Sequence, residues 1–154
     1  MEMALNSQAW AYRSVATLIE SGGIVGGLIR LHGALVIAEN AISALRRSED
    51  NAPDTWGELI RYHKNHSEEI QGLLERHGIP PDADGGYRTT GDDEPGAILS
   101  LETDNLAPEP AVKEIEQAVC DAYAAALSAD GLPVVDRETL LLQRSGLRRI
   151  WAKI

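Results

Sequence analysis

The chain has 154 residues, 44% of them hydrophobic and 25% charged, which is typical of one globular domain with its own core. It contains three Trp, four Tyr and no Phe, so the core must be aliphatic, a mix that favours helices. The formal net charge of −10 argues against binding nucleic acid through a basic face, and the single cysteine excludes an intrachain disulfide.

The first predicted element is an amphipathic helix over residues 3–20. Its apolar residues recur every three or four positions, as on one face of a helix: Leu5, Ala9, Tyr12, Ala16 and Ile19. Ser21, Gly22 and Gly23 end the pattern. We assign residues 1–23 to a separate N-terminal helix and expect it to serve in oligomerisation, with Trp10 and Tyr12 as anchors of a homodimer.

Four longer helices are predicted from the same spacing of apolar residues. Their expected ranges are Ile24 to Arg47, Asp54 to His77, Glu109 to Ala129, and Asp136 to the C-terminus. Asp54 or Thr55 is the expected N-cap of the second, and Asp136 that of the fourth. Glycine followed by proline ends the second and third of these helices, because proline cannot continue a helix.

The connection between the two pairs of helices is long. Residues 78–108 are rich in Gly, Asp and Pro and are predicted to be loop, with a possible turn of helix at Ala97 to Leu101. A loop of this length inside a compact domain is explained if it carries the chain from one end of a bundle to the other. Residues 24–154 are therefore predicted to form an all-α four-helix bundle, two antiparallel hairpins joined by a long crossover at about 78–108.

Several polar residues interrupt the apolar stripes. Glu39 and Glu116 fall on the inner faces of the first and third bundle helices, and His63 and His66 lie one turn apart on the second. A carboxylate buried alone costs several kcal/mol, so these groups need partners. Two interpretations remain open: the four side chains bind a divalent cation such as iron, manganese or zinc, or they hydrogen-bond one another without any metal.

The order of elements and these residues resemble the ferritin-like superfamily, including bacterial ferritin-like domains of unknown function. In its di-iron members the first and third helices each give a Glu, and the second and fourth each give Glu-x-x-His. Here Glu39 and Glu116 match the single glutamates, and His63-Lys64-Asn65-His66 matches the second-helix motif with His in place of Glu. Gln143-Arg144-Ser145-Gly146 falls at the fourth-helix motif and has neither ligand.

The resemblance thus implies a degenerate site. We expect a non-catalytic ferritin-like protein that binds at most one divalent metal, through Glu39, His63, His66 and Glu116, or binds none. The alternatives are a di-iron oxidoreductase or ferroxidase, and a homodimeric interaction module. The sequence also predicts no membrane span, no membrane or nucleic-acid partner and, lacking a basic leader followed by an apolar run, a cytoplasmic location.

Overall fold

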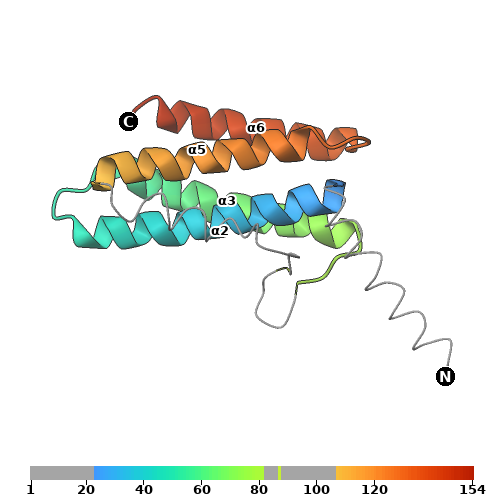
Figure 1. Ribbon diagram of the computed structural model, residues 1–154, viewed down its shortest axis with the longest axis horizontal. Coiled ribbons are helices and arrows are strands. Elements are labelled where there is room, and N and C mark those ends of the chain that lie inside the picture. Colours follow the sequence, from blue (N-terminus) through green and yellow to red (C-terminus); the bar gives the residue numbers. More distant parts are fainter. Residues whose placement is uncertain (1–22, 82–86, 88–106) are drawn as a thin grey trace, which may run out of the picture.

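The computed structural model describes residues 23–81, 87 and 107–154, and in that part it is all-α. The helices are α2 (Ile24–Ser48), α3 (Asp54–Arg76), α5 (Pro108–Leu127) and α6 (Val134–Trp151) (Figure 1). This confirms the predicted all-α class and the four helices of the bundle. The predicted helix over residues 3–20 and the turn at Ala97 to Leu101 lie outside the described residues.

Each helix has two neighbours. α2 packs against α3 and α5, α6 packs against the same two, and α2 and α6 occupy opposite corners without contacting each other as described helices (Figure 1). Gly27 near the start of α2 lies against Ala126 near the end of α5, and Lys153 just after α6 reaches Glu58 near the start of α3. The two ends of the bundle are therefore each built from helix starts and helix ends together.

The core is aliphatic, as the composition predicts. The three- and four-residue spacing in each helix places one stripe of side chains inside, where Leu28, Leu35, Leu59, Leu140 and Val119 are fully buried. Tyr123 is the largest fully buried side chain among the described residues. Removing this apolar area from water is the main force that holds the four helices together.

Glycines end two of the helices. The backbone of Gly78 has φ +80° and follows α3, where the N–H groups of Gly78 and Ile79 bond to the carbonyls of Glu75 and Leu74. This is the Schellman arrangement, and the left-handed conformation favours glycine. Gly131, with φ +77°, adopts the same left-handed conformation in the turn between α5 and α6. The glycine stops predicted from the sequence are confirmed.

The predicted side-chain caps are wrong. Pro53 and Pro133 occupy the N-cap positions of α3 and α6, and neither helix has a side-chain cap hydrogen bond. α6 starts at Val134, so Asp136 lies within its first turn. Asp136 is buried there and bonds to His77 rather than to the backbone of its own helix, which joins the start of α6 to the end of α3.

α2 is the most apolar helix of the described part of the chain. Its length and a mean hydropathy of 1.3 over its best window would allow it to cross a membrane. Core helices of bundles have the same composition, and α2 contributes eight hydrophobic side chains to this core: Val25, Leu28, Ile29, Leu31, Ala34, Leu35, Ala38 and Ile42.

The close contact of α2 with α5 gives a stability prediction. A Cβ atom on Gly27 would lie 3.2 Å from the Ala126 Cα, which belongs to a backbone that cannot move without separating the helices. A Cβ on Gly72, also helical, meets nothing within 4 Å. Gly72→Ala should therefore raise the free energy of unfolding by about 0.5–1 kcal/mol, the usual helical gain. Gly27→Ala should lower it by about 1–3 kcal/mol. Urea denaturation of both variants measures this, and equal gains in the two would contradict the tight contact.

Candidate functional site

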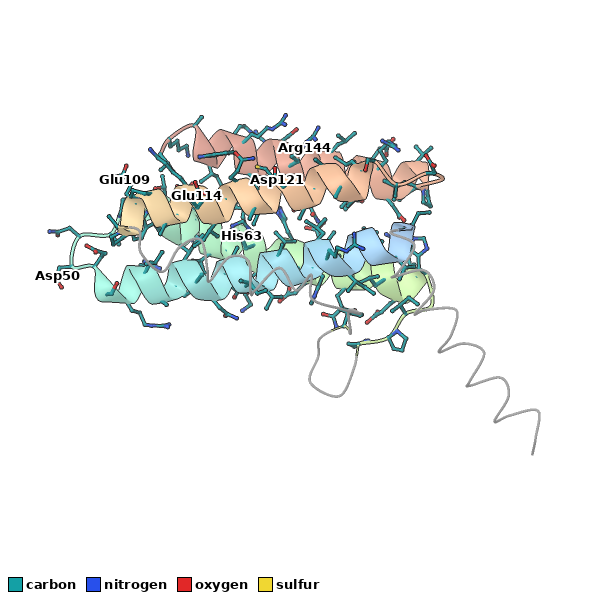
Figure 2. The ribbon with its side chains drawn as sticks, in the orientation of Figure 1. Asp50, His63, Glu109, Glu114, Asp121 and Arg144 are labelled. Carbon is teal, nitrogen blue, oxygen red and sulfur yellow. The ribbon has the colours of Figure 1, made fainter. Side chains whose placement is uncertain are left out.

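The centre of the bundle holds a buried histidine–glutamate pair between α3 and α5. The His63 Nε2 and Glu116 Oε1 atoms are 2.6 Å apart, and their side chains are 0% and 1% exposed. Figure 2 labels His63, whose side chain lies between the helices near the middle of the bundle. The helical spacing of each residue from its apolar neighbours turns both inward, so the carboxylate and the imidazole satisfy each other away from water.

A second set of hydrogen bonds links α3, α5 and α6. The Tyr123 hydroxyl donates to the Gln143 Oε1 at 2.8 Å, and its oxygen lies 3.3 Å from the His66 Nδ1. Since the single hydroxyl proton goes to Gln143, the His66 Nδ1–H must donate to Tyr123. The three side chains therefore form one directed chain, which leaves the His66 Nε2 as a free lone pair.

Burial shifts the titration of this second set. Desolvation, with a smaller contribution from the charge of His63, lowers the pKa of His66 to about 4. Desolvation and nearby carboxylates raise the pKa of Tyr123. Near neutral pH, His66 is therefore an uncharged imidazole and Tyr123 an uncharged phenol, the states that the directed chain requires.

Two polar atoms in this centre have no partner among the described residues, the His63 Nδ1 and the Gln143 Nε2. An orphaned buried group costs about 1–3 kcal/mol unless water or a ligand satisfies it. The polar cluster is thus nearly but not fully saturated by the protein itself.

Of the four predicted metal ligands, only His63 and Glu116 bond to each other. His66 contacts the Tyr123 hydroxyl instead. Glu39 is only partly buried, and among the described residues it has no side-chain hydrogen bond or ion pair. In the part of the chain described, no group of three or more His, Cys, Asp or Glu side chains is arranged to hold a metal ion. The metal site stays a prediction.

The fourth helix carries a glycine where a ligand would be expected from the resemblance. A Cβ atom on Gly146 would lie 2.9 Å from the Cε1 of Tyr62 on α3, inside normal contact distance. The Tyr62 ring in turn packs edge-on against His66, with ring centroids 5.2 Å apart. Gly146 therefore admits an aromatic ring from α3 into the space that a side chain on α6 would otherwise fill.

Sequence reasoning missed the roles of two tyrosines. Tyr123 lies seven residues, two helical turns, after Glu116 and so shares its face, although it was assigned no role from the sequence. That spacing was a usable signal. Tyr62 neighbours His63 in sequence and carries no periodicity signal of its own, because its ring is turned toward Gly146 by packing between two helices.

Two further histidines are held outside this centre. His77, at the end of α3, bonds through its Nε2 to the Asp136 Oδ2 at 2.7 Å, and Arg76 lies 3.8 Å from the same carboxylate. His32 on α2 packs edge-on against Tyr87, and burial lowers its pKa. Both contacts have structural explanations, joining helix ends in one case and holding part of the connection against α2 in the other.

Comparison of the chain with protein-family models, with curated proteins and with solved structures finds no match. The class of protein defined by the fold is therefore an all-α four-helix bundle with a buried polar centre. Its function has to be inferred from that centre and from the surface.

The buried pair gives a second stability prediction. Glu116→Ala should lower the free energy of unfolding by about 3 kcal/mol or more, because it leaves His63 buried without a partner. Glu116→Gln, whose amide oxygen can still accept from the His63 Nε2, should cost about half as much. Glu114 lies on the exposed side of α5 (Figure 2), and Glu114→Ala should change stability by no more than about 0.5 kcal/mol. Chemical denaturation compares the three variants. A Glu116→Ala protein as stable as Glu114→Ala would show that the pair is not buried.

The contact of Gly146 with Tyr62 predicts a coupling between these positions. Gly146→Ala alone should forgo the usual helical gain of about 0.5–1 kcal/mol, because the new methyl group meets the Tyr62 ring. In a Tyr62→Ala background the same substitution should become stabilising, since the ring is gone. A double-mutant cycle by thermal or urea unfolding measures the coupling free energy. Additive effects would mean that the ring does not fill this space.

Proposed function

We propose that this protein is a ferritin-like bundle of two antiparallel hairpins joined by a crossover, in which side-chain hydrogen bonds replace the di-iron centre. The arrangement of neighbours supports the topology, because each helix lies beside two others and opposite ends meet along α2–α5 and α3–α6. It has a structural or binding role and carries out no oxygen or iron chemistry.

The single observation that carries this proposal is the 2.6 Å contact between the His63 Nε2 and the Glu116 Oε1. Both groups would be metal ligands in the degenerate site, and here each is the partner of the other. A cation that binds them must first break a buried, charge-assisted hydrogen bond, so the free energy of that bond is subtracted from the metal affinity.

Two further observations support a centre that is no longer catalytic. The Gln143 Oε1 accepts a hydrogen bond from the Tyr123 hydroxyl, where the di-iron motif would have a carboxylate, and Gly146 supplies no side chain at all. A dinuclear centre needs ligands for both ions, bridging carboxylates among them. The described residues of α6 contribute none, whereas Glu39, His63, His66 and Glu116 could together hold at most one divalent ion.

The test is the metal content and metal affinity of untagged protein. We expect less than one iron, manganese or zinc ion per chain after purification, and no oxygen consumption on addition of Fe²⁺. If a single ion is bound, Glu39→Ala and His66→Ala should each abolish it, while Glu68→Ala, an exposed change on α3, should leave it in place. Elemental analysis, calorimetric titration and an oxygen electrode provide the measurements. Two irons per chain with oxygen turnover would overturn the proposal in favour of the di-iron oxidoreductase.

A further inference from the structure

The large exposed hydrophobic side chains of the described residues gather at one edge of the bundle. Four of the five lie on α6, which forms the upper edge in Figure 1: Val134, Val135, Leu141 and Leu142. The fifth is Tyr62 on α3, whose ring lies against Gly146, one helical turn beyond Leu142. Leu142 itself is 74% exposed. An apolar surface of this kind usually marks a contact with another molecule.

A stripe of exposed residues, the outer stripe, runs along the full length of α6 on this surface. Its members follow one another by three and four positions, the spacing that keeps side chains on one face of a helix: Val135, Glu138, Leu142, Ser145, Arg149 and Ala152. All six are exposed, and the backbone is still helical at Ala152, which ends α6. The outer stripe can therefore receive a second helix along its whole length.

The outer stripe is complementary to itself when it is reversed. If a second α6 lies antiparallel with its Arg149 opposite Glu138, the same spacing sets Leu142 opposite Ser145 and Val135 opposite Ala152. Opposite charges then meet, and each large apolar side chain faces a small one. Because a two-fold axis relates the copies, each of these contacts is made twice.

Other alignments of the outer stripe lack this match. Two parallel helices related by a two-fold axis would set Glu138 against Glu138 and Arg149 against Arg149. An antiparallel pair displaced by one heptad in one direction sets Glu138 against Leu142. Displacement in the other direction leaves Val135 and Glu138 beyond the end of the partner chain. The match is therefore specific to one orientation and one register.

The charge of α6 also favours a second copy as the occupant. α6 contains four arginines against Asp136 and Glu138, a net of +2 in a chain of −10, so the remaining residues carry −12. A dimer joined through α6 keeps this acidic remainder of each copy out of the contact. An anionic membrane, which a helix with apolar and arginine side chains could also bind, would repel the same remainder.

We propose that α6 packs antiparallel against the α6 of a second copy through the outer stripe, and that the chain forms a symmetric dimer in this way. Val134 and Leu141 border the outer stripe on the side of α5, and Tyr62 borders it on the side of α3. All five exposed hydrophobic side chains thus lie in or beside the contact. This inference goes beyond the proposed function and uses none of the residues in the centre of the bundle.

The first experiment measures the mass of the full chain in solution. Sedimentation or light scattering should show a dimer in equilibrium with the monomer. Leu142→Glu should raise the dissociation constant about a hundredfold or more, because each dimer loses two buried leucines and gains two buried charges. Ala125→Glu adds the same charge at an exposed position on α5 and should leave the dimer intact. Circular dichroism checks that both variants are folded.

Two results of this experiment would overturn the proposal. One is a wild-type chain that is monomeric, including a monomer that binds vesicles of anionic lipid, which would assign the face to a membrane. The other is a dimer that Leu142→Glu and Ala125→Glu affect equally, because that dimer would use another surface.

The second experiment tests the orientation and the register. Glu138→Arg and Arg149→Glu each create two like-charge contacts in the symmetric dimer, and each should raise the dissociation constant about tenfold. The double variant restores opposite charges at both contacts and should associate nearly as well as the wild type. Glu114→Arg, an exposed change on α5, serves as the control and should have little effect.

Rescue by the double variant reports a contact between copies. Glu138 and Arg149 are three helical turns apart, about 16 Å along α6, so they cannot pair within one chain. A double variant as weak as the single ones would reject this register. Both experiments leave the centre of the bundle unchanged, so the metal content of the same proteins tests the proposed function separately.

Discussion

The structure depends on the requirement that every polar group inside an aliphatic bundle find a partner. Glu116 and His63 lie where no water reaches them, and a lone charge at either position would cost more free energy than the bundle can spare. Their 2.6 Å contact removes that cost and fixes the relative positions of α3 and α5, which are not neighbours in sequence and lie diagonally across the bundle. The stripes of Leu, Ile and Val supply most of the stability, while this pair helps to specify one arrangement of the helices.

The same constraint explains the second set of hydrogen bonds. Tyr123 is fully buried, so its hydroxyl needs an acceptor, and Gln143 supplies one from α6 while His66 donates to the same oxygen from α3. α6 packs less extensively than α2 against its neighbours, so these polar contacts and the bond of Asp136 to His77 carry a larger share of its attachment. A centre of this kind orders the helices, because its hydrogen bonds link α3, α5 and α6.

Periodicity predicted the four described helices and, apart from Glu39, their inner faces correctly, because both follow from spacing along one helix. Gly78 and Gly131 were equally readable, since a left-handed backbone favours glycine. The caps were mispredicted because Pro53 and Pro133 occupy the N-cap positions, and Asp136 bonds to His77 instead. Partners across helices could not be read at all: spacing turned His63 and Glu116 inward, but only packing shows that they bond to each other and that Tyr123 engages His66.

The contact of Gly146 with Tyr62 has a consequence for redesign. Anyone who wished to install a metal ligand on α6 would choose position 146, and a histidine there would have to occupy the volume already held by the Tyr62 ring. The change therefore has to be made in pairs, with a smaller residue at 62 introduced first, and removal of that ring also takes away the edge-on support of His66. Packing thus makes the absence of a ligand on this helix difficult to reverse by any one substitution.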